Sequence, residues 1–438
     1  MKASEIARIV NGKLIGEDLQ VNSFEFDSRK CGKGSLFIAL KGNRDGHDFI
    51  NDAFEKGAVG ALASKKHTVP AVPAGKFLVL VEDTLKGFSK IASQKRKGFK
   101  GTAIAVTGSV GKTTTKELLS HFLSKRLSVY FNTKSYNNLI GVSYTLSNLP
   151  NNAEVYVQEL GTNKKGEIKE LTEIVKPDIA VVTYVGKAHT ENFGSFKEIV
   201  EEKLSITESA EIAVVPYEFR EYSRGKKTIT FGKMGYISLQ SVKLSPEGTE
   251  FILKIKDGKE KFFTPIPGYS VVNATMVAAA IALEMDIPLK ELKEAVLSFQ
   301  PPEMRMNVLK LKGTTVINDA YNANPISMAN AIKVLSTYSG KKIAVLGEML
   351  ELDNAEEEHR KLGELLKEHR IDTVIATGEN AAAILETFNG EAYHFVDRKE
   401  FLNFIKRYEF SNATVLVKGS RANRLEEVVE ILKKRYRS

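Results

Sequence analysis

The chain has 438 residues, 42% of them hydrophobic and 27% charged, so we expect two or three domains, each with a core of its own. Lys and Arg outnumber Asp and Glu by 63 to 54, but the two signs are interleaved, which favours small polyanions such as nucleotides as ligands over nucleic acid. A single cysteine excludes an internal disulfide, and neither a signal-peptide core nor an apolar run of roughly 20 residues occurs, so we expect a cytoplasmic protein without a membrane span.

The opening stretch is typical of a small α/β domain. A helix is predicted at 50–57 and strands at 58–63 and 77–81, and the basic, glycine-containing segment 95–101 is predicted to be a linker. We therefore place an N-terminal domain at residues 1–98.

The pattern changes after this segment. An apolar strand, a glycine loop and a helix follow one another, and strands then alternate with helices, which is typical of a parallel, doubly wound sheet. Alternating strands and turns interrupt this pattern and predict a small β insertion. These elements are expected at 102–106 (strand), 113–125 (helix), 155–158 and 179–183 (strands), 197–209 (helix) and 237–263 (insertion). Together they predict a central domain at residues 99–300.

A second boundary is predicted at the consecutive prolines 301–302, which end a predicted helix at 289–299. Strands alternating with helices then return, so a second open sheet of Rossmann type is expected at residues 301–438. Its strands are predicted at 315–318, 342–346, 373–376 and 414–417. The predicted fold is thus α/β in three domains.

One loop between a predicted strand and a predicted helix indicates nucleotide binding. Its residues are Thr107, Gly108, Ser109, Val110, Gly111, Lys112, Thr113 and Thr114. Glycines allow several N–H groups to face one point, and the helix N-terminus adds positive potential. Lys112 could reach the outer phosphates and Thr113 could place a hydroxyl on Mg²⁺. The strict Walker pattern has glycine where Val106 stands, and a tight turn is the alternative, but the strand before and the helix after favour phosphate binding.

Three later residues could complete a metal site. Glu159 ends a predicted strand, where ligands bind in open α/β sheets, and its oxygens suit Mg²⁺. His189 follows another strand and could be a second ligand. Taken alone, Glu159 is equally consistent with a surface glutamate. A lone loop histidine such as His189 is more often a polar surface residue, and the charged neighbours of Lys203 favour a solvated helix face.

In their order and spacing these segments resemble the ATP-dependent Mur ligases of peptidoglycan synthesis, over essentially the whole chain. Segment 319–328, which begins Asp-Ala-Tyr-Asn-Ala-Asn-Pro, is similar to the signature of members that add D-alanyl-D-alanine, as are 346–352 with His359 and 418–421. Segments 27–29 and 46–49 resemble the uridine-nucleotide domain shared with members that add a diamino acid, whose Asp-Asn-Pro-Arg motif is absent from this sequence.

The resemblance implies ligation of D-Ala-D-Ala to UDP-MurNAc-tripeptide through an acyl phosphate, with ATP converted to ADP and phosphate. It implies catalytic roles for Lys112, Lys203 and His189, and metal ligation by Thr113, Glu159, His189 and a carbamylated Lys203, with two Mg²⁺ ions. It further implies ATP contacts by the phosphate loop and by Asn273, Arg305, Asp319, Asn322 and Asn324. It implies substrate contacts by Ser28, Arg29, Gly46, His47, Asn137 and Asn138. One departure is the segment between Gly268 and Asn273, which is shorter than is usual in the family.

Two other kinds of function are alternatives: a different ligase and a nucleotide-regulated binding protein. Another Mur-type ligase or a folylpolyglutamate-type ligase is the nearest alternative, and segment 319–328 argues against the folate enzyme. A nucleotide-regulated binding protein would leave the joint occurrence of Glu159, His189 and Lys203 without a reason. A monomer is expected, and the third residue of the tripeptide, lysine or diaminopimelate, is left open.

Overall fold

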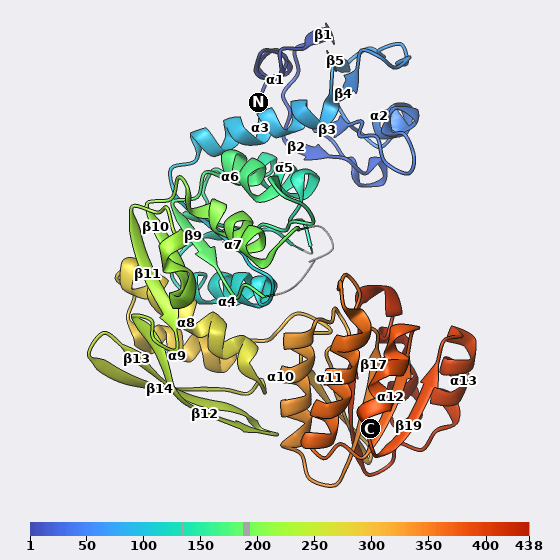
Figure 1. The fold of residues 1–438 in the computed structure, drawn as a ribbon. Helices are drawn as coiled ribbons and strands as arrows, with labels where there is room; N and C mark the ends of the chain where they lie inside the picture. Colours follow the sequence, from blue (N-terminus) through green and yellow to red (C-terminus); the bar gives the residue numbers. More distant parts are fainter. Residues whose placement is uncertain (134, 187–192, 438) are drawn as a thin grey trace.

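The structure is a computed structural model that describes residues 1–133, 135–186 and 193–437. Three α/β units follow one another along the chain, each built on its own sheet, and Figure 1 shows them in chain order from the blue N-terminal unit to the red C-terminal unit. The predicted three-domain α/β fold is therefore confirmed, while the boundaries after residues 98 and 300 stay predictions. Within the described ranges, no helix combines the length and the apolar character needed to cross a bilayer.

The N-terminal unit contains a five-stranded sheet in the order β1-β5-β4-β3-β2, parallel except where β1 pairs with β5. Its central strands are almost wholly apolar and buried, as is expected of parallel strands covered on both faces. The elements are α1 (Ala3–Val10), β1 (Lys13–Gly16), β2 (Ser23–Glu25), β3 (Ser35–Ile38), α2 (Ile50–Glu55), β4 (Gly60–Ser64), β5 (Phe77–Val81) and α3 (Thr84–Gly98).

The prediction of a linker at 95–101 is wrong for residues 95–98, because α3 continues through Gly98, whereas residues 99–101 join α3 to β6. Basic side chains in a last helical turn are favoured by the partial negative charge of the free carbonyl groups. Arg96 is also held from outside the helix: its Nε donates to the Val175 carbonyl at 2.7 Å and its Nη2 to Asp178 at 2.9 Å. A tertiary contact thus keeps helical a segment whose composition resembles that of a loop.

Polar contacts attach the N-terminal unit to the next one. The Asn148 side chain donates to the Phe24 carbonyl and accepts from the Phe24 N–H, both at 3.0 Å, and so pairs with the edge strand β2. The Tyr144 hydroxyl donates to Glu25 at 3.2 Å, and α3 packs along α5. Figure 1 shows α3 lying between the two units.

The central unit contains a nine-stranded sheet in the order β14-β13-β12-β11-β10-β9-β6-β8-β7. Neighbouring strands from β7 to β12 pair in parallel, and β12, β13 and β14 form the predicted insertion, an antiparallel meander that extends the same sheet. Its elements are β6 (Thr102–Thr107), α4 (Lys112–Leu123), β7 (Val129–Phe131), α5 (Leu139–Ser147), β8 (Val155–Glu159), α6 (Glu167–Val175), β9 (Ile179–Val182), α7 (Phe196–Leu204), β10 (Ile212–Pro216), β11 (Lys227–Gly232), β12 (Ile237–Ser245), β13 (Gly248–Ile255), β14 (Gly258–Thr264), α8 (Tyr269–Glu284) and α9 (Leu289–Ser298).

The C-terminal unit contains a six-stranded sheet in the order β15-β16-β20-β17-β18-β19, in which only β15 is antiparallel. Buried residues of α10, α11 and α12 cover one face, and those of α13 and α14 cover the other, which is the predicted doubly wound arrangement. Its elements are β15 (Asn307–Leu311), β16 (Thr314–Asn318), α10 (Pro325–Ser336), β17 (Lys341–Gly347), α11 (Ala355–Glu368), β18 (Thr373–Thr377), α12 (Ala383–Thr387), β19 (Glu391–Phe395), α13 (Arg398–Arg407), β20 (Ala413–Lys418) and α14 (Glu426–Arg435).

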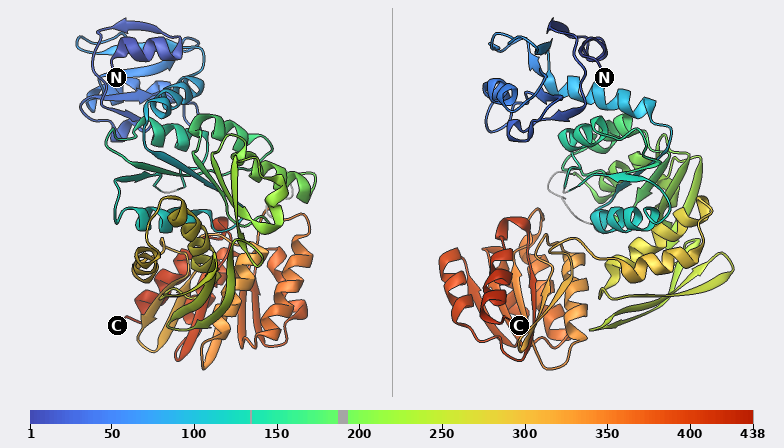
Figure 2. Two further views of the ribbon diagram at one scale, coloured as in Figure 1. Left: turned by 90° about the vertical axis from the view of Figure 1, so that its left-hand side faces the viewer. Right: turned by 180° about the vertical axis from the view of Figure 1, so that it is seen from behind.

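The meander of the central unit reaches the C-terminal unit. The Tyr338 hydroxyl, just after α10, donates to the Pro246 carbonyl in the turn between β12 and β13 at 3.4 Å. Figure 2 shows this arrangement from two further directions, with the meander beside the C-terminal unit. The chain itself passes from one unit to the other through the segment between α9 and β15.

Candidate active site

A cleft of about 1090 Å³ lies between the central and C-terminal units. It is bordered by the residues that follow β6, β8 and β16, at the carboxyl edges of the two sheets, where ligands bind in open α/β folds. The predicted site residues that line it are Ser109, Val110, Gly111, Lys112, Thr113, Thr114, Asn137, Asn138, Glu159, Asn273, Arg305, Asp319, Asn322 and Asn324. The structure thus brings together residues that lie far apart in the sequence.

The predicted phosphate loop joins β6 to α4. Gly108 and Gly111 have φ angles of 148° and 87°, which only glycine adopts without strain, and Gly111 immediately precedes the helix. A Cβ on Gly108 would lie 2.0 Å from Thr183 Oγ1. Thr107 is buried, and its hydroxyl donates to the Leu160 carbonyl at 2.8 Å. Thr107 and Gly108 therefore shape the loop without lining the cleft.

The loop is braced by the segment that follows β9. The Ser109 N–H donates to the Tyr184 carbonyl at 2.7 Å, and the Thr183 hydroxyl donates to the Val110 carbonyl at 2.7 Å. The Gly186 N–H donates to Ser109 Oγ at 3.1 Å. These bonds fix the curvature of the loop independently of any ligand, which favours binding of a phosphate group.

Lys112 begins α4 and folds back over the loop, with Nζ donating to the Gly108 carbonyl at 2.7 Å. Burial lowers the pKa of Lys112, the charge of Glu159 opposes this shift, and the charge of Arg305 adds to it. The Lys112 ammonium has already lost most of its hydration, so an approaching anion stabilises its charged form. The ammonium is therefore suited to bind a phosphate.

Glu159 ends β8, and its side chain is held by neutral donors. Its Oε2 accepts from the Thr113 hydroxyl at 2.8 Å and its Oε1 accepts from Asn137 Nδ2 at 2.9 Å, while its own N–H donates to Asn132 Oδ1 at 2.8 Å. The residue is only 3% exposed. A buried carboxylate beside a hydroxyl at the end of a phosphate loop is an oxygen-rich site that suits Mg²⁺.

Lys203 lies on α7, where the sequence predicted a solvated helix face as the alternative, but its side chain is 3% exposed. Burial lowers its pKa to about 7, and the charge of Lys112 acts in the same direction, while Glu202, Glu167 and Glu159 oppose the shift. A buried lysine with this pKa has a substantial neutral fraction near pH 7. The predicted ligand His189 lies outside the described residues.

Comparisons with known proteins agree with this geometry. Three family models match the chain: the Mur ligase family, catalytic domain, at residues 20–96; the Mur ligase middle domain at 106–282; and the Mur ligase, glutamate ligase domain, at 304–421. This chain belongs to the Mur ligase family.

Relatives and solved structures of the family match along nearly the full length. The UDP-N-acetylmuramoyl-tripeptide–D-alanyl-D-alanine ligases of Bacillus subtilis and Escherichia coli are 35% and 32% identical, each over 98% of this chain and 97% of the relative. A crystal structure of MurF from Acinetobacter baumannii has 29% identity and a TM-score of 0.90, covering 99% of this chain and 98% of that one. MurF from Thermotoga maritima in complex with ADP has 29% identity and a TM-score of 0.83, covering 95% and 98%.

On the C-terminal side of this Mur ligase, a buried ion pair supports the cleft. Lys418 Nζ, at the end of β20, donates to Asp319 Oδ2 at 2.6 Å and to the Asn322 carbonyl at 2.9 Å. The other carboxylate oxygen of Asp319 accepts from the Met306 N–H at 3.0 Å. Arg305 reaches the phosphate loop, where its Nη2 donates to Thr113 Oγ1 at 3.0 Å.

Two of the predicted asparagines cap helices. Asn138 Oδ1 accepts from the Gly141 N–H at 3.0 Å at the start of α5, and Asn324 Oδ1 accepts from the Ser327 N–H at 2.9 Å at the start of α10. These amide oxygens are occupied, so the two residues border the cleft mainly as caps. Asn273, on α8, and Asn322 are exposed at the cleft.

The predicted uridine-nucleotide residues of the Mur ligase lie in the N-terminal unit, outside the described cleft. Ser28 is buried, whereas the Arg29 side chain is 83% exposed and paired with Asp27 at 2.9 Å. Gly46 passes close to the Leu40 backbone, where a Cβ would lie 2.6 Å from the carbonyl oxygen. The Arg29 side chain is therefore accessible to a ligand, whereas Ser28 is buried and Gly46 allows the close approach of the Leu40 backbone.

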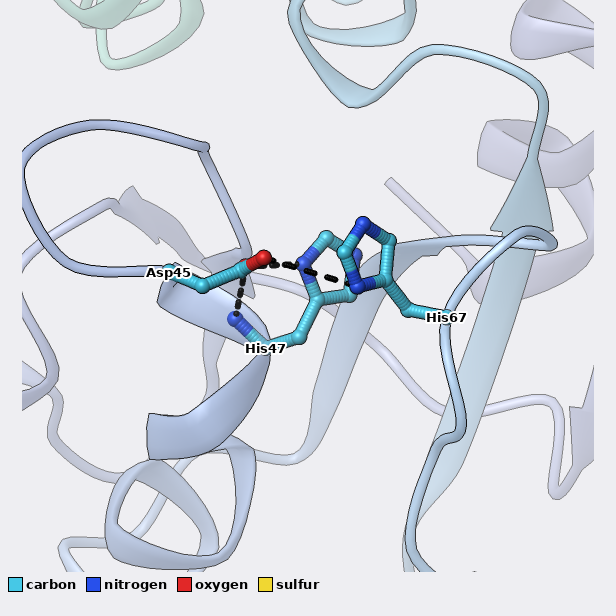
Figure 3. A group of neighbouring side chains, drawn as sticks. All are labelled: Asp45, His47 and His67. Carbon is cyan, nitrogen blue, oxygen red and sulfur yellow. Dashed lines mark hydrogen bonds and ion pairs between the residues drawn. The ribbon is translucent and has the colours of Figure 1, made fainter.

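His47 belongs to a group with Asp45 and His67 that has the composition of a metal site (Figure 3). Its Nε2 accepts from the Ser64 N–H at 2.8 Å, so the ring proton lies on Nδ1, which donates to Asp45 Oδ1 at 2.6 Å. The His67 ring stacks on it at 4.0 Å between centroids. Both nitrogens of His47 are thus engaged, and the ring has no lone pair for a cation.

Sequence reasoning assigned no role to Lys418 or Tyr321, although both stand in the segments that resemble the family. A signal for Lys418 was present: a lysine that ends a mostly apolar strand lies at the carboxyl edge of the sheet and needs a partner there. Tyr321 borders the cleft, and its hydroxyl is hydrogen bonded to Ser135 Oγ on the central unit.

Proposed function

We propose that this chain catalyses the ATP-dependent ligation of D-alanyl-D-alanine to UDP-MurNAc-tripeptide, yielding the UDP-MurNAc-pentapeptide, ADP and phosphate. One observation carries the proposal: a phosphate loop and a buried carboxylate on the central unit face Arg305 and Asp319 across a single cleft. The names of the relatives that match over nearly the whole chain support this choice of substrates.

The residues of the cleft fit ATP and a divalent cation. The glycine turn, the Lys112 ammonium and the N-terminus of α4 are suited to the phosphates. Thr113 and Glu159 would hold Mg²⁺, together with His189 and a carbamylated Lys203 for a second ion. When bound, Mg²⁺ would offset the negative charge of the phosphates.

Carbamylation of Lys203 is proposed because the amine is buried and its pKa is about 7, so a neutral amine is available to react with CO₂. The amine nitrogen would bond to the carbon of CO₂ and lose a proton to solvent, which gives a carbamate, a buried anion in place of the amine. Its presence can be tested by nuclear magnetic resonance after equilibration with isotope-labelled bicarbonate. The labelled carbamate signal is expected in the native chain and absent from Lys203→Ala; a spectrum without that signal would refute this part of the proposal.

The reaction must overcome the low reactivity of a carboxylate. In the first step, a carboxylate oxygen of the tripeptide attacks the γ-phosphorus of ATP, which forms an acyl phosphate and releases ADP. Two anionic groups approach each other, and Lys112 and Arg305, on opposite walls of the cleft, stabilise the charge. In the second step, the dipeptide amine attacks the acyl carbon, loses a proton and displaces phosphate.

The N-terminal unit would bind the uridine nucleotide, with Ser28, Arg29, Gly46 and His47 as contacts and Asn137 and Asn138 nearer the peptide. In the C-terminal unit, Asp319, Asn322 and Asn324 would face ATP, as would Asn273 on α8. Nucleotide-linked substrates and a single thiol are consistent with a cytoplasmic enzyme; this location and the monomeric state stay predictions.

The test is phosphate release from ATP and Mg²⁺ with each of two UDP-linked tripeptides, ending in lysine or diaminopimelate, with and without D-Ala-D-Ala. Release that requires both substrates, with a pentapeptide product by mass, is expected for one or both tripeptides. Lys112→Met should abolish release, whereas Lys125→Met, which removes an exposed charge just beyond α4, should not. Release with a diamino acid and the dipeptide precursor instead would contradict the proposed substrates.

A further inference from the structure

Arg305 is carried by a segment with unusual backbone geometry. Met304 and Met306, its two neighbours, have φ angles of 59° and 57°, although neither is glycine. Such left-handed conformations persist only where the surroundings hold them in place, and they gather at functional sites. The segment lies just before β15, where the chain passes from the central to the C-terminal unit.

The loop after β16 holds both sides of this segment. The Tyr321 N–H donates to the Met304 carbonyl at 3.2 Å, and the Met306 N–H donates to Asp319 Oδ1 at 3.0 Å. Two backbone contacts from one short loop therefore fix the direction in which the Arg305 side chain leaves the chain.

The Tyr321 ring supports the rest of the side chain. The guanidinium carbon of Arg305 lies 4.2 Å from the centroid of that ring, a close cation–π contact. The Tyr321 hydroxyl is hydrogen bonded to Ser135 on the central unit, so the ring is fixed at both ends. From this position Arg305 Nη2 reaches Thr113 of the phosphate loop at 3.0 Å.

We propose that Tyr321 is a positioning residue, whose ring holds the Arg305 guanidinium toward the phosphate loop and so prepares it to bind the phosphates of ATP. This inference rests on the proposed function for the identity of the nucleotide. A free arginine side chain samples many rotamers, and each bond to a phosphate must overcome that entropy. The stacked ring removes most of this freedom before the nucleotide arrives, and Tyr321 acts through Arg305.

A double-mutant cycle distinguishes positioning from a general effect on the loop. The affinity for a non-hydrolysable ATP analogue with Mg²⁺ is measured by calorimetry for the wild type, Tyr321→Leu, Arg305→Met and the double variant. Tyr321→Leu is expected to weaken binding roughly 5- to 30-fold, the range of a partly desolvated cation–π contact. In the Arg305→Met background, Tyr321→Leu is expected to alter the affinity by less than about twofold, because the guanidinium that the Tyr321 ring holds is absent.

Two further variants test whether the ring itself is needed and whether the loss is specific to this position. Tyr321→Phe keeps the ring and should stay within about threefold of the wild type, and Tyr236→Leu, an exposed tyrosine outside the cleft, should leave affinity unchanged. An equal loss from Tyr321→Leu in both backgrounds, or no loss in either, would overturn the inference. Analogue binding does not depend on the acceptor substrate, so a failure of the proposed ligation would appear separately, in the phosphate-release assay.

Discussion

Replacing Lys418 by methionine tests how the C-terminal wall of the cleft is held. Methionine keeps the apolar stem of the lysine and removes its ammonium, which bonds to Asp319 at 2.6 Å and to the Asn322 carbonyl at 2.9 Å. The Lys418 side chain is 2% exposed and that of Asp319 is 15% exposed, so the variant leaves a largely desolvated carboxylate without its cation.

Breaking one side of a buried ion pair costs about 3–5 kcal/mol. Because Asp319 borders the cleft and retains some solvent, we expect the lower end of this range, about 3 kcal/mol. Adding Asp319→Asn to Lys418→Met removes the unpaired charge and keeps an oxygen that can accept from the Met306 N–H. The double variant should therefore regain more than half of the loss, to within about 1 kcal/mol of the wild type.

The assay is native-state hydrogen exchange in low urea, followed in peptides from β16 and β20, because global unfolding of a three-domain chain is not two-state. Lys341→Met is the matched control: the Lys341 side chain is 43% exposed and its ammonium pairs with Glu391 at 3.4 Å, so the loss should stay below about 1 kcal/mol. A Lys418→Met variant that loses no more than this control, or a double variant without recovery, would refute the reasoning.

Three further predictions follow from buried or constrained groups. Gly108→Ala should weaken ADP binding at least about 100-fold by calorimetry, because its Cβ would meet Thr183 Oγ1 at 2.0 Å in a strained backbone; unchanged affinity would contradict this. Burial raises the pKa of Cys31 to about 11, so iodoacetamide should react roughly 100-fold more slowly with the native than with the urea-unfolded chain at pH 8. Burial lowers the pKa of His359, which accepts from the Met349 N–H. The contribution of this residue to stability should therefore be complete above about pH 6.5 and fall below it by up to about 1.4 kcal/mol per pH unit; native-state hydrogen exchange of His359→Gln, followed in peptides from α11 as a function of pH, should lack this component.

Local patterns predicted the elements that position the site. The phosphate loop was predictable because the glycines, the lysine and the flanking strand and helix are consecutive in the chain. The end of α9 before the prolines, and four strands of the C-terminal sheet (β16, β17, β18 and β20), were likewise predictable to within one residue, because each depends on its own composition. The two edge strands of that sheet, β15 and β19, were not predicted.

Contacts between distant residues could not be predicted in the same way. Asp319 and Lys418 are 99 residues apart, and Arg305 and Thr113 are 192 apart, so their pairing depends on the order of strands in two sheets and on the packing of two units. The incorrect linker has the same cause: the contact of Arg96 with Val175 lies 79 residues away and is absent from the local pattern.

The contacts of α3 and Asn148 join the N-terminal unit, which holds the proposed uridine site, to the central unit, which holds the phosphate loop. A substrate that binds at the first site and reacts at the second must span the distance between them. One extended residue spans about 3.3–3.6 Å, so a precursor one residue short would leave its carboxylate that far from the γ-phosphate. In the proposed reaction, the separation of the two sites would thus select a peptide of the right length, in addition to any contact with its side chains.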